Sequence, residues 1–319
     1  MDATTSSAPA LEGPRIFFFS GKGGVGKTTL AAATASHLAR RGRRVLITST
    51  DPAHNLADVF DRTIGDRGAE LAANLRALEI DASARWAAAT GMLRGAAEEG
   101  GRRGRLQRAL LDTMGPLGEA PGVDEMVAME LMIEAASSKD YDAVIFDTAP
   151  TGHALRLLFL PQMLDGWLGK MLALRDAFSW VGRTVRRILP GRRAGEEALH
   201  TGLTSARQRV EAARAALTDP RRTHFALVTI PEAISVLESE RTIRQLKDHG
   251  IPLGTLFVNM LQPASDTCPH CAARRAIHER EIGRIRAISG EVPVRLVECH
   301  PTVIRGLEAL AQLGERLWA

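Results

Sequence analysis

The sequence predicts an α/β protein with a doubly wound, mostly parallel β-sheet. Short apolar runs alternate along the chain with stretches of helical composition, which favours a sheet covered by helices on both faces. The runs are continuously apolar, as strands buried on both faces require. A glycine-rich loop follows the first run, where a sheet of this kind binds its ligands. The predicted strands are Arg15–Ser20, Arg44–Ser49, Leu75–Asp81, Asp142–Asp147, Thr223–Ile230, Gly254–Asn259 and Val292–Val297.

Length and composition favour one large domain in a reducing compartment. The chain has 319 residues, of which 45% are hydrophobic and 24% charged, enough to bury a sizeable core. Three cysteines do not make a disulfide framework, so we expect a cytoplasmic protein. No apolar run reaches the roughly 18–20 residues that span a bilayer. Residues 1–14 lack the pattern of a secretory signal and are predicted to be a disordered lead-in to a single domain over residues 15–319.

Two long segments depart from the alternation of strand and helix. Residues 86–138 and 161–220 are mostly helical in pattern, with breaks at Gly100-Gly101, Gly115-Pro116 and Pro190-Gly191. Neither is flanked by a long linker rich in proline and serine. We therefore expect one helical subdomain inserted into the sheet domain.

The glycine-rich loop is typical of a phosphate-binding site. Glycines allow backbone N–H groups to converge on phosphate oxygens, and the N-terminus of the following helix, Thr28–Arg40, adds a favourable dipole. Lys27 is expected to bridge the β- and γ-phosphates of ATP, and the Thr28 hydroxyl to hold Mg²⁺. The loop reads Gly21-Lys22-Gly23-Gly24-Val25-Gly26-Lys27-Thr28-Thr29.

An extra lysine, Lys22, distinguishes this loop from an ordinary phosphate-binding loop. The pattern Lys-Gly-Gly-x-Gly-Lys-Thr resembles the deviant loop of the SIMIBI-like P-loop ATPases, which include MinD, ParA, the nitrogenase iron protein and the ArsA-like enzymes. The resemblance implies that Lys22 reaches across a homodimer to the partner's nucleotide. A positive charge there would offset charge that develops on the transferred phosphoryl group.

Three further motifs narrow the resemblance to one family. They follow predicted strands and read Asp51-Pro52-Ala53-His54-Asn55-Leu56-Ala57-Asp58-Val59-Phe60, Asp147-Thr148-Ala149-Pro150-Thr151-Gly152-His153 and Ile230-Pro231-Glu232-Ala233 with Glu238-Ser239-Glu240-Arg241. Together with the loop, these motifs resemble those of the arsenical pump-driving ATPases (ArsA) and the targeting ATPases for tail-anchored membrane proteins. The resemblance runs from about Arg15 to Leu313, nearly the whole chain.

Two aspartates, one at the end of a predicted strand and one just beyond another, are candidates to act at the phosphates. Asp147 can hold a water bound to Mg²⁺. The resemblance implies that Asp51 positions or activates the attacking water, although Asp51 before Pro52 can also cap a helix. Asn55 is expected to contact the γ-phosphate or support the switch segment.

The adenine site is expected at the end of the sixth predicted strand. Asn259 matches the asparagine that recognises adenine in the family, and an amide can both donate to and accept from the base. Its other interpretation is the cap of a buried turn. Relatives carry a glutamate before an Ile-Arg-Gly string near the C-terminus, whereas Pro301–Gly306 has Val303 at that position. The far wall of the adenine pocket is therefore expected to depart from the family's pattern.

Cys268-Pro269-His270-Cys271 stands where the targeting ATPases carry a Cys-x-x-Cys pair. Structural zinc takes four ligands, so two protomers with Cys268 and Cys271 each would complete a site across the dimer. One alternative is a site within the chain that adds His278 and Cys299 or His300. Another is a redox-active or inert pair of thiols.

The expected function is an ATPase that couples Mg-ATP hydrolysis to opening and closing of a dimer around hydrophobic, tail-anchored membrane-protein segments. In the targeting ATPases, client-binding helices lie in the region of residues 161–220, where large apolar residues recur at helical spacing. The other interpretation of this apolar stripe is that it packs in a core. A membrane receptor, transient membrane contact and no nucleic acid are expected. The alternatives are an ATPase that energises arsenite efflux and a MinD- or ParA-like positioning ATPase. The large apolar residues at helical spacing within residues 161–220 are Leu164, Trp167, Leu168, Met171, Leu172, Phe178, Val181, Val185 and Ile188.

Overall fold

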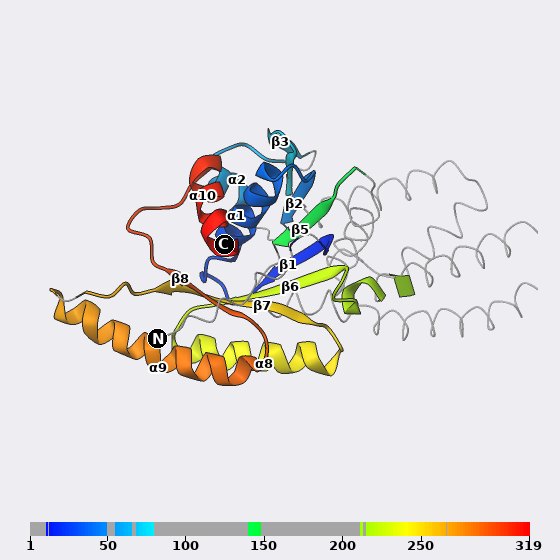
Figure 1. The fold of residues 1–319 in the computed structure, drawn as a ribbon. Coiled ribbons are helices and arrows are strands. Elements are labelled where there is room, and N and C mark those ends of the chain that lie inside the picture. The colour runs from blue at the N-terminus through cyan, green and yellow to red at the C-terminus, as the bar shows by residue number, and fades with distance from the viewer. Residues whose placement is uncertain are drawn as a thin grey trace, which may run out of the picture.

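An eight-stranded β-sheet forms the centre of the computed structural model (Figure 1). The structure describes residues 11, 13–49, 55–65, 68–79, 140–147, 211–212, 215–265 and 267–319. The strand order is β3-β4-β2-β5-β1-β6-β7-β8. The strands are β1 (Ile16–Ser20), β2 (Val45–Ser49), β3 (Ala69–Ala72), β4 (Leu75–Glu79), β5 (Ala143–Asp147), β6 (Thr223–Thr229), β7 (Leu253–Leu261) and β8 (Val294–Glu298).

The sheet confirms the predicted fold class. Each predicted strand corresponds to one of the parallel strands, and the central β1, β2, β5 and β6 are buried throughout. The sequence analysis missed β3, which pairs antiparallel with β4 at the edge of the sheet through a turn in which Asn74 has φ of 64°. Because β3 is short and only Leu71 within it is buried, it lacks the apolar run that marks the other strands.

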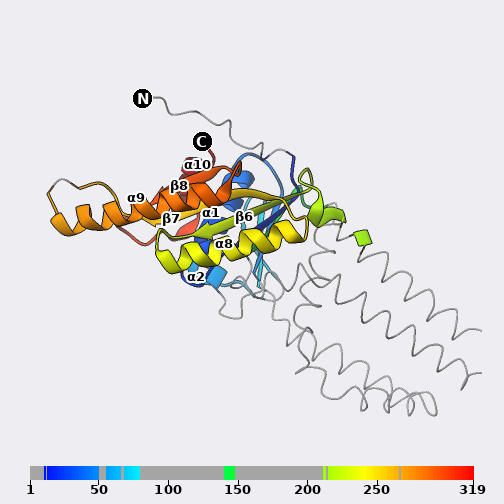
Figure 2. The same ribbon diagram turned by 90° about the horizontal axis from the view of Figure 1, so that it is seen from below.

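Helices cover both faces of the sheet (Figures 1 and 2). On one face lie α1 (Lys27–Arg40), α2 (Asn55–Phe60) and α10 (Gly306–Trp318), and on the other α8 (Ala233–Asp248) and α9 (Pro269–Ser289). Alanine fills much of the buried side of α1, so α10 can pack closely against it. A Cβ atom on Gly314 would lie 2.3 Å from the carbonyl oxygen of Ala33, which explains the glycine in α10.

Trp318 joins the last helix to the core. Its indole N–H donates to Thr34 Oγ1 over 2.9 Å, and its ring meets Phe257 and His224 edge-on. Burial lowers the pKa of His224 to about 4, so its ring is neutral at neutral pH and contacts Thr255 Oγ1 at 3.1 Å. The last helix is packed on the domain through buried apolar residues that include Leu310 and Leu317.

The topology changes direction at β1. From β1 the chain continues through α1 to β2 on one side, whereas β6, β7 and β8 follow in order on the other side. In open α/β sheets this switch point is the preferred place for a ligand, outside the carboxyl ends of the strands. The glycine-rich loop follows β1 directly.

Several predicted segments lie largely outside the described residues. Residues 86–138 and most of 161–220 belong to this group, with residues 211–212 and 215–218 helical where they are described. The predicted lead-in of residues 1–14 packs against the domain at its end, because Arg43 donates to the carbonyl oxygens of Leu11 and Pro14. Within the described part of the chain, no helix is long and apolar enough to cross a membrane.

Candidate functional site

The loop between β1 and α1 depends on glycine at defined positions. Gly21, Gly24 and Gly26 have φ values of 152°, 78° and 90°. Residues with a Cβ atom rarely adopt such values. A Cβ on Gly21 would lie 2.1 Å from the carbonyl oxygen of Val228, and one on Gly26 would lie 2.3 Å from Asn259 Nδ2. These close approaches fix the loop against β6 and β7 and bring it to the N-terminus of α1, where anions bind.

The two lysines of the loop lie in different environments. Lys27 is 7% exposed, and its Nζ donates to the carbonyl oxygen of Lys22 over 3.1 Å. The side chain of Lys22 is 43% exposed, with its Nζ 3.7 Å from Glu238 Oε1 on α8. The backbone of Lys22 is thus anchored by Lys27, while its own ammonium group lies beside Glu238 of α8.

Asp147 and Thr28 lie at the ends of neighbouring elements. Asp147 closes β5 and is 1% exposed, and it is in register with Phe19 of β1, two residues before the loop. Thr28 is half-buried in the first turn of α1. The carboxyl ends of adjacent parallel strands share one edge of the sheet, so both predicted Mg²⁺ ligands belong to the phosphate-loop edge.

Asn259 of β7 holds the phosphate loop through a side-chain hydrogen bond. The side chain is 9% exposed, and its Nδ2 donates to the carbonyl oxygen of Val25 over 2.8 Å. The amide of Asn259 therefore joins β7 to the part of the loop where Val25 is fully buried. The neighbouring Met260 has φ of 56° and is 41% exposed.

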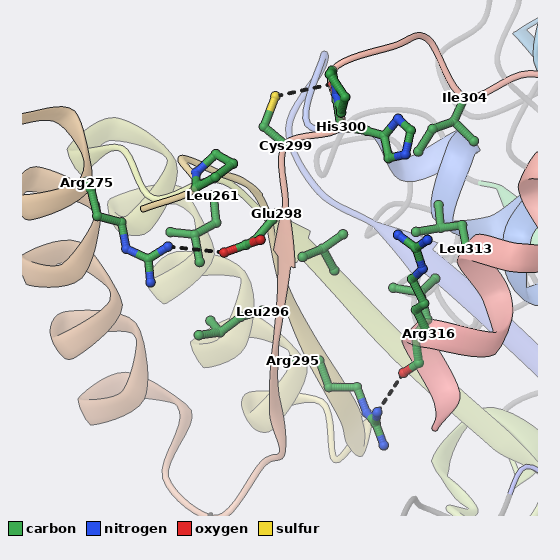
Figure 3. Close-up of a pocket in the computed structure, with 14 residues that line it drawn as sticks. Leu261, Arg275, Arg295, Leu296, Glu298, Cys299, His300, Ile304, Leu313 and Arg316 are labelled. Carbon is green, nitrogen blue, oxygen red and sulfur yellow. Dashed lines mark hydrogen bonds and ion pairs between the residues drawn. The ribbon is translucent and has the colours of Figure 1, made fainter. Parts of the chain in front are cut away.

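A cavity of about 780 Å³ follows the free edge of β8 and the side of α10 (Figure 3). Its lining includes Leu261 of β7, which lies two residues beyond Asn259. Pro301 and Ile304, from the segment between β8 and α10, also line it. Val303, at the position where the family resemblance implies a glutamate, is 79% exposed. Ion pairing of Arg275 with Glu298 at 3.4 Å bounds the side toward α9.

Cys268 and Cys271 are adjacent at the start of α9, and both are half-buried. The N–H of Cys271 donates to Cys268 Sγ over 3.4 Å. Hydrogen bonds from the backbone and thiol of Cys271 lower the pKa of the Cys268 thiol, and the shared thiol hydrogen bond raises the pKa of Cys271.

The zinc site within one chain is not assembled. His278 Nδ1 accepts from the N–H of Gln262 over 3.1 Å, and Cys299 contacts the carbonyl oxygen of His300. Across the described ranges, no three histidine, cysteine, aspartate or glutamate side chains are grouped as metal ligands. A complete four-ligand site built on Cys268 and Cys271 therefore needs ligands from elsewhere.

The other predicted catalytic segment is described only from α2 onward. Asp51 and the side chain of Asn55 lie outside the described residues, as do the residues that follow Asp147 in the predicted switch. The N–H of Ala57 donates to Glu79 Oε1 over 3.1 Å. Glu79 is 3% exposed and joins β4 to the helix that follows Asp51. Sequence reasoning missed this residue, whose only signal is an acidic side chain at the end of a buried strand.

Comparison with known proteins identifies similar chains along nearly the full length. A family model described as anion-transporting ATPase matches residues 14–319. ATPase GET3B of Arabidopsis thaliana is 36% identical over 327 residues, covering 95% of this chain and 79% of the relative. An ATPase ASNA1 homolog of Entamoeba histolytica is 34% identical over 310 residues, covering 95% and 93%. ATPase get3 of Neurospora crassa is 34% identical over 334 residues, covering 99% and 94%.

Proposed function

The chain belongs to the anion-transporting ATPase family, and we propose that its ATPase cycle opens and closes a homodimer that captures and releases hydrophobic membrane-protein segments of the tail-anchored type. One observation carries the proposal: the phosphate loop holds one lysine buried and its second lysine outward. A buried lysine suits the protomer's own nucleotide, and an outward lysine suits a nucleotide held by another protomer.

Within one protomer, the loop from Gly21 to Thr29 would bind the triphosphate through its N–H groups, with Lys27 at the β- and γ-phosphates. The buried position of Lys27 beside the loop supports this role. Thr28 and Asp147 would hold magnesium, which neutralises charge on the phosphate oxygens. Thr28 follows the phosphate loop after β1, and Asp147 ends the neighbouring β5. Both residues offer oxygen atoms, which a hard cation such as Mg²⁺ prefers.

Hydrolysis would use the segment that follows β2. Asp51 would orient the attacking water, and Asn55, the first residue of α2, would contact the γ-phosphate or the switch. Asn259 would contribute to the adenine side of the site while holding the loop through the carbonyl oxygen of Val25. The cavity lined by Pro301 and Ile304 would offer apolar surface close by.

Each protomer would also supply Cys268 and Cys271 to one zinc ion on the two-fold axis. Their adjacency at the start of α9 fits half of a tetrahedral thiolate site, and the zinc would act as a structural clasp. We expect Cys268→Ser to remove bound zinc and to shift the protein toward monomer. Elemental analysis and sedimentation check this outcome, with Cys299→Ser as the matched control. Unchanged zinc content in Cys268→Ser would refute the clasp.

The client would be bound by the predicted helical segments, which lie outside the described residues. Support comes from the helical spacing of large apolar residues within 161–220 and from relatives named GET3 and ASNA1 along nearly the whole chain. The arginine clusters 102–108 and 183–193 would face a membrane receptor or an anionic lipid surface. We propose a cytoplasmic protein that contacts membranes transiently.

Arsenite efflux is less well supported than client capture. Arsenite is a soft ligand that needs three thiolates, and the chain has three cysteines in total. Among the described residues, Cys299 does not join Cys268 and Cys271 in a metal-binding group. Strong stimulation of ATPase activity by arsenite, lost on replacing the cysteines, would favour the pump-driving role.

Capture of a model client tests the proposal. We expect the full chain with magnesium and a non-hydrolysable ATP analogue to co-elute with a soluble reporter that carries a segment of about 20 apolar residues near its C-terminus. A reporter with arginines inserted into that segment is the matched control. Release on exchange to ADP would support coupling, whereas equal retention of both reporters, or of neither, would contradict it.

A further inference from the structure

Lys22 is held by a carboxylate of its own chain. Its Nζ lies 3.7 Å from Glu238 Oε1, within ion-pair distance, and Glu238 lies on α8, an element that the phosphate-loop motif does not include. The carbonyl oxygen of Lys22 accepts from Lys27 Nζ, so the backbone of the loop is fixed at this residue. The flexible four-carbon side chain of Lys22 can still change the position of its ammonium group.

Glu238 is suited to hold this one cation. Its second oxygen, Oε2, is buried and has no hydrogen-bond partner within the described structure, so its contact with Lys22 offsets the loss of water at the carboxylate. The two nearest acidic residues of the same segment have other cations. Glu232 is 3.7 Å from Arg274, and Glu240 is 3.1 Å from Arg244.

The face of α8 around Glu238 also carries apolar side chains. Ile234 is 65% exposed and Leu237 is 45% exposed, and residues three and four apart share one side of a helix. Large apolar side chains at such exposure, beside an ion pair with a half-exposed lysine, suit a face that another protein covers. Lys22 therefore lies beside a partly exposed apolar face of α8.

We propose that Glu238 is the resting-state partner of Lys22 and that this ion pair must open before Lys22 reaches the nucleotide of a second protomer. The inference rests on the proposed function, since it needs a lysine that acts across the dimer. Glu238 is a positioning residue: it acts on turnover only through Lys22. Opening the ion pair leaves the Glu238 carboxylate without its cation, which opposes closure of the dimer. Closure becomes favourable when a bound triphosphate attracts Lys22 more strongly than Glu238 does.

Glu238→Gln tests the inference because it keeps the size of the side chain and removes the charge. Two pairs open in each dimer, so we expect the dimer dissociation constant with magnesium and a non-hydrolysable ATP analogue to fall about fourfold to 25-fold. Turnover at saturating protein should stay within about twofold of the unchanged protein. Glu240→Gln, which removes a charge two residues away, is the matched control and should leave both quantities unchanged.

A double-variant cycle separates a role through Lys22 from a general effect of charge. In a Lys22→Ala background, Glu238→Gln should no longer change the dimer constant, measured by sedimentation. The inference is overturned if Glu238→Gln still lowers the dimer dissociation constant in the Lys22→Ala background. It is also overturned if Glu238→Gln alone leaves that constant unchanged. Full turnover in Lys22→Ala alone would instead overturn the proposed function, so the two failures are distinguishable.

Discussion

Lys22→Ala should lower the turnover of ATP by at least about 100-fold while ATP affinity stays within about threefold of its original value. The physical reason is the outward position of Lys22, whose ammonium group contacts Glu238 of α8 and not the interior of the loop. Its charge would act on the transferred phosphoryl group of the partner's nucleotide, where the distribution of negative charge changes in the transition state. Steady-state hydrolysis and equilibrium binding of a fluorescent ATP analogue measure the two effects separately.

Lys27→Ala is the informative comparison for Lys22→Ala. Lys27 is buried at the start of α1 and contacts the loop itself. Its removal should weaken ATP binding as well as turnover, because its charge would contact the phosphates already in the ground state. If Lys22→Ala lost affinity and turnover in equal measure, the two lysines would share one role, and the assignment of Lys22 to the partner's site would be wrong.

Asp51→Asn should lower turnover by about 100-fold to 10,000-fold and leave the protein as an ATP-bound closed dimer. The change preserves the shape of the side chain and removes the charge that would orient or activate the attacking water. Since binding of the triphosphate does not use that charge, the complex should form and persist. Single-turnover hydrolysis and sedimentation after addition of Mg-ATP check both expectations.

Asp58→Asn provides the matched control for Asp51→Asn. Asp58 is an exposed residue of α2, which follows the same strand, and its charge should matter little to turnover. Retained hydrolysis in Asp51→Asn would remove Asp51 from the catalytic residues. A loss of activity without an accumulated dimer would show that the aspartate supports the fold of the segment and not the chemistry.

Continuous hydrophobicity predicted the central parallel strands because those strands are covered on both faces. β5 and β6 illustrate this: each is buried along its full length, so its sequence has no alternation to confuse it with a surface strand. β3 escaped prediction because it is a short edge strand in which only Leu71 is buried. Its pairing with β4 depends on a local turn at Asn74, which the hydrophobic pattern does not indicate.

The phosphate loop could be located from sequence, but its supports could not. Glycine spacing and the following helix specify the loop locally, whereas the contact of Asn259 with Val25 joins residues 234 positions apart. The pairing of Lys22 with Glu238 likewise depends on the placement of α8 beside the loop. Glu238 belonged to a recognised motif, yet no spacing in the sequence indicated which cation it would meet.

The cysteine pair shows how structure narrowed a set of alternatives. Sequence left open whether His278 or Cys299 joins Cys268 and Cys271 in one chain. The structure places His278 in a hydrogen bond with the backbone of Gln262 and leaves the cysteine pair as two potential ligands at the start of α9. The spacing of these residues in the sequence cannot show whether their side chains meet, because that depends on how the end of β8 approaches α9.

Mixing the two inactive variants tests most directly whether a lysine is donated between protomers. A dimer of one Lys22→Ala protomer and one Asp51→Asn protomer contains a site with its own Asp51 and a Lys22 from the neighbour. If the subunits are exchanged before ATP is added, an equimolar mixture should hydrolyse in its first turnover about one quarter of the ATP that the unchanged protein hydrolyses, because half of its dimers carry one intact site. A mixture no more active than the separate variants would contradict donation of Lys22 across the dimer.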